Sequence, residues 1–193
     1  FTLFREEALR ARVQHSGLRV ALTDAPGAAR LAPLGVQGLT QAQLTASLYH
    51  EVAATGPESP AVLMYTSGTT GAPKGALHGH RLLTGHLPGV EMSHDFLGQP
   101  GDVLWTPADW AWIGGLFDVL MPGLALGVPV VAGPAQKFSS KIFARLICEA
   151  DIRNAFLPPT ALRMLRADGI QVQGLRSVAS GGEPLGAEML DWG

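Results

Sequence analysis

The sequence predicts an α/β fold in which a mostly parallel sheet is flanked by helices. Short apolar runs typical of strands alternate with longer runs that have helical spacing. This alternation is typical of parallel sheets covered on both faces. The 193 residues, 47% of them hydrophobic, are enough for one sizeable core. No repeat, low-complexity segment or linker interrupts the sequence, so we expect residues 1–193 to form a single, partial domain.

The expected strands are short and apolar, and the expected helices carry apolar residues at three- and four-residue spacing. The strands cover residues 19–23, 61–65, 103–106, 129–132, 155–158 and 176–180. The helices cover residues 3–14, 40–52, 139–150, 160–167 and 185–192. Thr40 is suited to cap the second of these helices.

Charge and cysteine content narrow the class of protein. The net charge is −2 and no run of Lys or Arg occurs, so a nucleic-acid-binding surface is not expected. Cys148 is the single cysteine, which excludes an intramolecular disulfide and agrees with a reducing, cytoplasmic location. Because Cys148 lies in the expected helix 139–150, we expect a buried, structural thiol there.

Neither a membrane span nor a signal peptide is expected. The apolar stretch 113–132 is broken by Asp118, Pro122, Pro129 and several glycines. The N-terminal residues 1–13 carry charges where a signal peptide needs an apolar segment. The chain starts without Met and stops inside an expected helix, so we expect truncation at both ends. The sequence leaves the oligomeric state open.

A glycine- and hydroxyl-rich loop follows the expected strand 61–65. Residues 65–75 read YTSGTTGAPKG. Glycine lets backbone N–H groups approach an anion closely, and hydroxyl groups add donors to phosphate oxygens. Lys74 adds a positive charge, and Pro73 stiffens the exit of the loop. These features predict a loop that holds a polyphosphate.

Two common nucleotide-binding motifs do not match this loop. A Walker A motif needs Gly at the position of Pro73 and Ser or Thr at that of Gly75, so a kinase with that motif is disfavoured. The GxGxxG pattern does not match either. The remaining alternative is a surface turn rich in Gly and Thr.

The loop resembles the signature Ser/Thr-Ser-Gly-Ser/Thr-Thr-Gly-x-Pro-Lys-Gly of the adenylate-forming, or AMP-binding, superfamily. This superfamily includes acyl-CoA synthetases, adenylation domains of peptide synthetases, and luciferases. The continuation Gly75-Ala-Leu-His-Gly-His80 is similar to a GVxHxH sequence of acetyl- and medium-chain acyl-CoA synthetases. The resemblance extends from Leu3 to Trp192 and implies part of the large N-terminal domain of the adenylate-forming fold.

The resemblance also implies a function. The parent enzyme would be an AMP-forming acyl-CoA synthetase that converts a small-molecule carboxylic acid into acyl-AMP and then transfers the acyl group to CoA. It implies ATP and Mg²⁺ as cofactors and CoA as co-substrate. The residues that it implies in phosphate binding are Thr66, Ser67, Gly68, Thr69, Thr70, Gly71 and Lys74. It assigns no metal ligand within this chain, and the family's catalytic Lys lies outside it.

A second segment, residues 105–115, reads WTPADWAWIGG. It is similar to a TADxGWxxG segment of acyl-CoA synthetases, which implies that Trp112, Ile113 and Gly114 line the acyl and CoA pocket. Two alternatives stay open from the residues alone. Trp105, Trp110 and Trp112 are also explained as core aromatics, and Asp109 is either a helix N-cap, which we favour, or a carboxylate of the site.

A third segment, residues 180–184, reads SGGEP. The pattern predicts a strand end followed by a helix that Glu183 and Pro184 open, and both residues suit a first helical turn. The resemblance implies that Gly182, Glu183 and Pro184 contact the adenine and α-phosphate of AMP. It places Gly181 in the acyl pocket, where the missing side chain implies an acyl group larger than acetate.

Other positions carry weaker expectations. His78 is expected to be a strand residue, and His80 either has no special role or borders the CoA channel. The segment 158–160 is expected to end a strand and cap the following helix.

By the resemblance, the aromatic-Gly-x-Thr-Glu segment, the ribose-binding Asp and the catalytic Lys follow after Gly193, so we expect the isolated chain to be inactive. Two alternatives for the function remain. One is an adenylation domain that loads a carrier protein, and the other is a nucleotide-binding module without catalysis.

Overall fold

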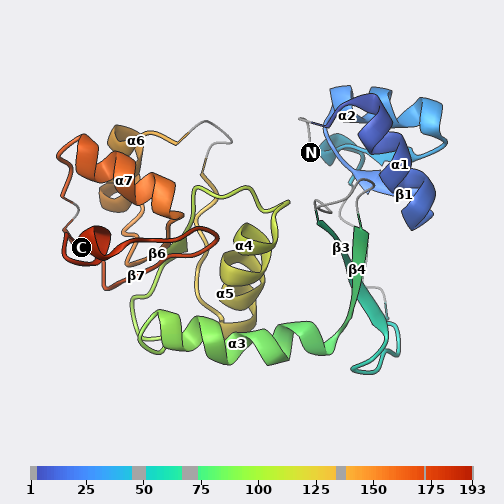
Figure 1. Ribbon diagram of the computed structural model, residues 1–193. Helices are drawn as coiled ribbons and strands as arrows, with labels where there is room; N and C mark the ends of the chain where they lie inside the picture. The colour runs from blue at the N-terminus through green and yellow to red at the C-terminus, as the bar shows by residue number, and fades with distance from the viewer. Residues whose placement is uncertain (1–3, 45–50, 67–73, 134–137, 172, 193) are drawn as a thin grey trace. The chain divides into compact units, whose positions relative to one another are not determined.

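The structure is a computed structural model, in which residues 4–44, 51–66, 74–133, 138–171 and 173–192 are described. The chain divides into two compact units, Phe1–His80 and Arg81–Gly193 (Figure 1). Each unit is described separately below.

The first unit starts with a small α/β arrangement. Its elements are α1 (Glu6–Ser16), β1 (Val20–Leu22), α2 (Ala25–Leu31), η1 (Ala32–Leu34), β2 (Gln37–Leu39) and the single 3₁₀ turn η2 (Gln41–Gln43). Strands β1 and β2 pair in parallel. Asp24 caps α2 by accepting a hydrogen bond from the backbone of Gly27. The core of this arrangement consists of Val13, Leu31 and Val36.

A β-hairpin completes the first unit. Strand β3 (Pro60–Thr66) pairs antiparallel with β4 (Lys74–Gly79), and the register places Thr66 opposite Lys74. The expected strand 61–65 is confirmed, and His78 lies in a strand as expected. The loop between the two strands, residues 67–73, lies outside the described residues.

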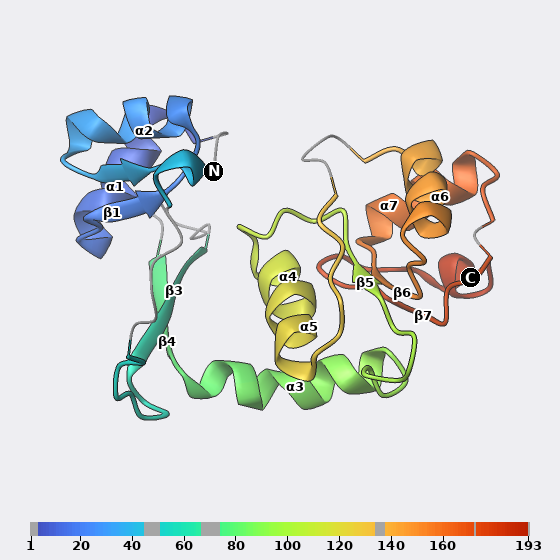
Figure 2. The ribbon, with the colours of Figure 1, turned by 180° about the vertical axis from the view of Figure 1, so that it is seen from behind.

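The second unit is built on a parallel sheet of three strands. They are β5 (Leu104–Trp105), β6 (Asn154–Phe156) and β7 (Ser177–Ala179), in that order. Figure 2 shows them side by side. The expected strand 129–132 contributes only a parallel bridge between Val130 and Leu104. The prediction of parallel sheets flanked by helices is therefore confirmed.

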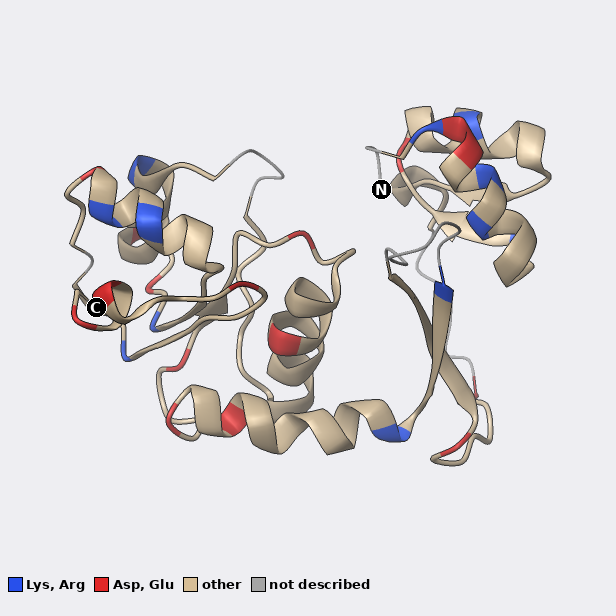
Figure 3. Cartoon of the chain, in the orientation of Figure 1, with Lys and Arg blue, Asp and Glu red and all other residues tan. Residues whose placement is uncertain are grey.

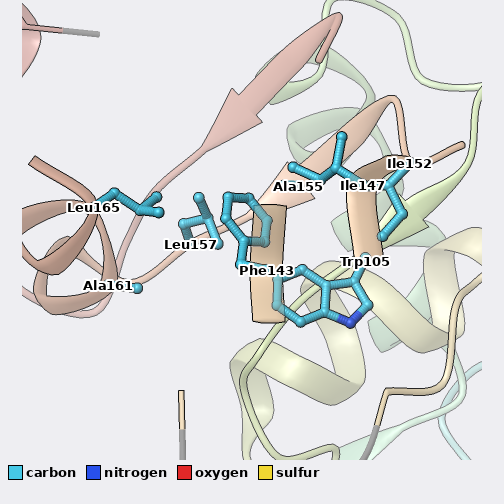
Figure 4. Close-up of a cluster of buried hydrophobic side chains, with 8 residues drawn as sticks. All are labelled: Trp105, Phe143, Ile147, Ile152, Ala155, Leu157, Ala161 and Leu165. Atoms are coloured by element: carbon cyan, nitrogen blue, oxygen red, sulfur yellow. The ribbon is translucent and has the colours of Figure 1, made fainter. Parts of the chain in front are cut away.

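Helices α6 (Ser140–Glu149) and α7 (Pro159–Ala167) cover one face of this sheet (Figure 2). The core on this face joins both helices to β5 and β6, and the rings of Trp105 and Phe143 stack with their centroids 5.1 Å apart. Its buried members, drawn in Figure 4, are Trp105, Phe143, Ile147, Ile152, Ala155, Leu157, Ala161 and Leu165.

The other face packs on α3 (Arg81–Ser93) and on a continuous helical stretch. This stretch consists of α4 (Ile113–Gly115), the π-helical turn η3 (Leu116–Leu120) and α5 (Met121–Leu126). The core on this face contains Val90, Leu97, Leu104, Val119 and Val128, with Phe156 packed against it. Leu104 and Trp105, like Ala155 and Phe156, belong to opposite cores because successive strand residues point to opposite faces.

A buried polar network joins the end of α3 to strand β7. The His94 side chain is 1% exposed, and its Nδ1 lies 2.8 Å from Oγ of Ser177. Asp102, 5% exposed, accepts two hydrogen bonds of 2.8 Å from Arg176 and further ones from the backbone N–H groups of residues 98 and 99. Asn154, also buried, lies 2.8 Å from the same Ser177 oxygen.

This environment shifts two pKa values in the network. Burial, and after it the positive charge of Arg176, lowers the pKa of His94 from 6.5 to about 4. Burial alone would raise the pKa of Asp102, but hydrogen bonds from Arg176, Gly98 and Gln99 outweigh it and hold this pKa below its ordinary value. The network therefore needs a neutral His94 and an ionised Asp102.

Three expectations about the elements are wrong. Of the expected helix 40–52, the described residues form only η2, and residues 44 and 51–52 are not helical; residues 45–50 lie outside the described part. The expected helix 185–192 shrinks to α8 (Ala187–Leu190). Cys148 is exposed rather than buried, because the buried face of α6 follows Phe143 and Ile147, and the next residue points about 100° away.

The charged residues are mixed in sign over both units. Figure 3 shows Lys and Arg positions interspersed with Asp and Glu positions along the described part of each unit. Among the described helices, none combines the length and the apolar character that a membrane span needs.

Candidate functional site

The hairpin β3–β4 holds the two ends of the predicted phosphate loop. Thr66 is the last residue of β3 and Lys74 the first of β4, and they lie opposite each other in the register. Both side chains are exposed. Of the other predicted phosphate-binding residues, Ser67, Gly68, Thr69, Thr70 and Gly71 lie outside the described residues. A hydroxyl and an ammonium group thus stand at adjacent positions where the loop begins and ends.

The base of this loop is anchored to α1 through Tyr65. The Tyr65 hydroxyl lies 2.7 Å from Nδ1 of His15 and 3.4 Å from the backbone oxygen of Arg12. Gly75, opposite Tyr65, is closely packed, since a Cβ there would lie 2.9 Å from Leu63 Cδ1 and 3.3 Å from His15 Cε1 and would make these side chains shift. Close packing at Gly75 and the Tyr65 contacts therefore hold the two strands where the loop begins and ends.

The predicted acyl-pocket segment begins at β5 and runs into α4. Trp105 is buried at 4%, so it is a core aromatic. Trp112 and Ile113 are 58% and 46% exposed at the start of α4. The core alternative is therefore correct for Trp105 and wrong for Trp112.

Asp109 is not the N-cap of the following helix, the role that we favoured for it. Its Oδ1 accepts a hydrogen bond of 2.9 Å from the backbone N–H of Ala111, and its carbonyl oxygen accepts one from Trp112. These bonds form a turn before α4, and Trp112, not Asp109, is the N-cap residue. The expectation that Asp109 caps the helix is wrong because the helix starts three residues later.

Gly114 and Gly181, which come from distant parts of the chain, border the same aromatic ring. A Cβ at Gly114 would lie 3.3 Å from Cε1 of Phe156, and one at Gly181 would lie 3.7 Å from Cε2 of the same ring. Neither glycine has a positive φ, so the backbone does not require glycine at either position. Gly181 therefore leaves room beside Phe156, whereas Gly114 allows Phe156 to approach the backbone closely.

The Gly182-Glu183-Pro184 segment is held by α7. The hydroxyl of Thr160 donates to the Glu183 carboxylate at 2.9 Å, and Nη2 of Arg163 lies 2.7 Å from Oε2 of Glu183. Gly182 has a φ of 89°, a conformation that favours glycine.

One expectation about the elements beside this segment is wrong. Glu183 and Pro184 do not open a helix, because Gly186, with a φ of 82°, is the N-cap of α8. The segment 158–160 follows β6 and caps α7 as expected, with Pro158 as the N-cap residue, while the Thr160 hydroxyl donates to Glu183.

Within the second unit the structure brings the predicted residues into two groups. Gly114 and Gly181 meet at Phe156, and Glu183 is bound by Thr160 and Arg163. The sequence prediction missed Phe156, because an aromatic residue in a strand is a core residue by pattern. It also missed Arg163, although its position one helical turn after Thr160 places both on one face of α7. Among the described residues, no group of three or more His, Cys, Asp or Glu side chains is arranged to hold a metal ion.

The fold and these segments define an adenylate-forming domain, and comparison with known proteins agrees. The family model described as "AMP-binding enzyme" matches residues 1–192. The chain therefore belongs to the AMP-binding enzyme family.

The chain matches only part of the length of each relative. It is similar to acetyl-coenzyme A synthetase 2 of Candida albicans, with 34% identity over 146 residues, which are 70% of this chain and 21% of that protein. It is also similar to the acetyl-coenzyme A synthetase of Cronobacter sakazakii, with 32% identity over 76% of this chain and 24% of that protein. The matched part is thus less than a quarter of either relative.

Solved structures show the same fold. The acyl-CoA synthetase of Brucella canis superposes with a TM-score of 0.85 and 25% identity, over 100% of this chain and 39% of that one. The structure matches the N-terminal domain of adenylate-forming enzymes, as the sequence predicts.

Proposed function

We propose that the protein containing this chain is an AMP-forming acid–thiol ligase that makes acyl-CoA. Its family membership supports this activity. The observation that carries the proposal is the register of the β3–β4 hairpin, in which Thr66 and Lys74 stand opposite each other at the two ends of the loop. A hydroxyl donor and a fixed positive charge there suit the phosphates of ATP.

The proposed reaction has two steps. A carboxylate oxygen of the acid attacks the α-phosphorus of ATP, the bond to the β-phosphate oxygen breaks, and pyrophosphate leaves. The sulfur of CoA then attacks the carbonyl carbon of acyl-AMP, and AMP leaves with the electron pair of the broken C–O bond. When bound, Mg²⁺ neutralises charge on the phosphate oxygens.

Residues of this chain act by binding and positioning in this proposal. The hydroxyl of Thr66 and the ammonium group of Lys74, with the loop residues Ser67 to Gly71, hold the phosphates still while the acid attacks. Glu183 is fixed by Thr160 and Arg163, so the backbone of residues 182–184 can contact the adenine and α-phosphate of AMP.

The acyl group is proposed to be larger than acetate. The support is the room beside Phe156 at Gly181, where a Cβ would meet the ring only at an ordinary contact distance and the backbone does not require glycine. Trp112 and Ile113, both exposed at the start of α4, would contact the acyl group or the CoA thiol.

An assay with the complete reading frame tests this proposal. Thioester formation is measured with ATP, CoA and straight-chain acids of increasing length, and a carrier protein replaces CoA in a parallel reaction. We expect CoA to be the acceptor and the kcat/KM for a longer acid to exceed that for acetate. If acetate is the best substrate, the proposal of a larger acyl group is wrong. If only the carrier protein accepts the acyl group, the protein is a carrier-loading adenylation enzyme.

The 193-residue chain by itself is proposed to be inactive in the same assay, because the family's catalytic Lys lies outside it. A measurable turnover would contradict this. The second candidate is nucleotide binding without catalysis, which the exposed Thr66 and Lys74 favour. Titration calorimetry of the chain with ATP tests it, and Lys74→Ala should weaken any binding that is seen. A cytoplasmic location is also part of the proposal and is tested by cell fractionation.

A further inference from the structure

A histidine–aspartate pair lies near Gly114 and Phe156 in the second unit. Nε2 of His86, on α3, lies 2.8 Å from Oδ1 of Asp118, on the π-helical turn η3. The two side chains are 38% and 31% exposed, so water and ligands can reach them. The ring of His86 also packs edge-on against Phe117, at 6.4 Å between centroids, which fixes its orientation.

The second oxygen of Asp118 lies beside Gly114 and the edge of Phe156. A Cβ at Gly114 would lie 3.4 Å from Oδ2 of Asp118 and 3.3 Å from Cε1 of Phe156. The carboxylate and the aromatic edge therefore both lie close to Gly114, where a larger residue would press on them. Among the described residues, this oxygen has no hydrogen-bond partner, whereas Oδ1 is bound by His86.

The backbone supports this arrangement. Pro122 has no N–H group, so it cannot bond to the carbonyl oxygen of Asp118 as an α-helix requires, and the helix widens into a π-turn at residues 116–120. Such turns occur frequently at functional sites. The irregular turn presents a charged side chain next to Gly114 instead of a residue of a regular apolar face.

We propose that Asp118, oriented by His86, binds a hydrogen-bond donor on the acyl chain of the substrate, so that the acid carries a hydroxyl or amino group. This inference rests on the proposed function, because it assigns a substrate class to the same acyl pocket. Asp118 is then a specificity-determining residue, and His86 is a positioning residue that acts through it.

Desolvation is the physical reason for this preference. A plain alkyl chain packed against Phe156 would cover the carboxylate oxygen without giving it a donor, and covering an unpaired charge is costly. A hydroxyl or ammonium group restores the lost hydrogen bond. Hydrogen bonds to charged groups contribute enough to discriminate between two substrates by about ten- to a hundredfold.

The test compares acids of equal length in the complete protein. The kcat/KM for thioester formation is measured with hexanoate, 6-hydroxyhexanoate and 6-aminohexanoate, and again with butanoate and its 4-hydroxy and 4-amino derivatives. We expect a hydroxy or amino acid to exceed its plain counterpart by about tenfold or more. Which of the two derivatives is better distinguishes an alcohol substrate from an ammonium substrate, and either result supports the donor site.

Variants of Asp118 and His86 test whether this pair causes the preference. Asp118→Ala should abolish the preference and raise the kcat/KM for the plain acid. Asp118→Asn, which keeps an acceptor oxygen, should retain part of the preference. His86→Phe should reduce the preference and raise the KM of the hydroxy or amino acid more than it lowers kcat. Asp168→Ala, at an exposed aspartate at the end of α7, is the matched control and should behave as the unmodified protein.

Two failures are distinguishable. If plain acids are activated and the derivatives are no better, the donor site is wrong while the proposed function stands. If no acid in either series is activated, the proposed function and the donor site are both wrong. A preference that persists in Asp118→Ala also overturns the assignment, and the comparison in the unmodified protein decides even if this variant does not fold.

Discussion

Lowering the pH from 7 to 5 should destabilise the second unit through His94. This side chain is buried beside Arg176, and the pKa in the folded state is about 4, against 6.5 as the ordinary value. Between these two values the unfolded chain binds a proton that the folded chain does not. The contribution of a neutral His94 to the free energy of unfolding is therefore fully present above pH 6.5 and is lost as the pH falls towards the folded pKa.

The magnitude follows from the two pKa values. For this single group the free energy of unfolding falls by about 2 kcal/mol between pH 7 and pH 5, and by about 3 kcal/mol in all below pH 4. The folded pKa of Asp102 is also lowered, so its contribution is lost only as the pH falls below the ordinary pKa of an aspartate. The window from pH 7 to 5 therefore reports mainly on His94.

Urea unfolding followed by tryptophan fluorescence measures this effect, since all four tryptophans lie in the second unit. The variant His94→Asn keeps a donor for Ser177 but does not titrate. Between pH 7 and pH 5 the free energy of unfolding should fall by about 2 kcal/mol less in this variant than in the unmodified chain. His80→Asn, at an exposed histidine, is the control. An equal pH dependence in His94→Asn and in the unmodified chain would refute the reasoning.

Three further changes test the site. Gly181→Val should fill the space beside Phe156 and lower kcat/KM for long acids by about tenfold or more, with little loss for acetate; steady-state kinetics over the acid series measures this. Tyr65→Phe removes the hydrogen bond to His15 and should lower the unfolding free energy by about 1 kcal/mol, measured by urea unfolding followed by circular dichroism. Arg163→Ala should change stability by less than about 1 kcal/mol, because the pair with Glu183 is more than 40% exposed, yet it should raise the KM for ATP.

The sequence predicted the strands of the second unit well, because their pattern is local. The runs 103–106 and 176–180 contain β5 and β7, and the run 155–158 overlaps β6, which starts one residue earlier. Helix α3 and the stretch 113–126 were not predicted, since Gly85, Pro88 and Gly89 in the former and several glycines in the latter lower helix propensity. Burial of Val90 and Val119 against the sheet favours these helices in spite of that.

Sequence motifs predicted individual residues of the site, but they did not predict the contacts between these residues. The glycines at 114 and 181 were singled out by resemblance, and the ring that joins them was not, because Phe156 lies far from both in the sequence. The same holds for His86 with Asp118 and for His94 with Ser177, whose hydrogen bonds span 32 and 83 residues. Local sequence patterns carry no signal for pairs at such separations.

Acid-dependent exchange of labelled pyrophosphate into ATP tests the central claim most directly, because it detects the formation of acyl-AMP without the thiol step. With the complete protein, exchange should require both ATP and an acid, and Lys74→Ala should reduce it by about tenfold or more. ATP cleavage to ADP and phosphate, or the absence of exchange with every acid tried, would contradict the account.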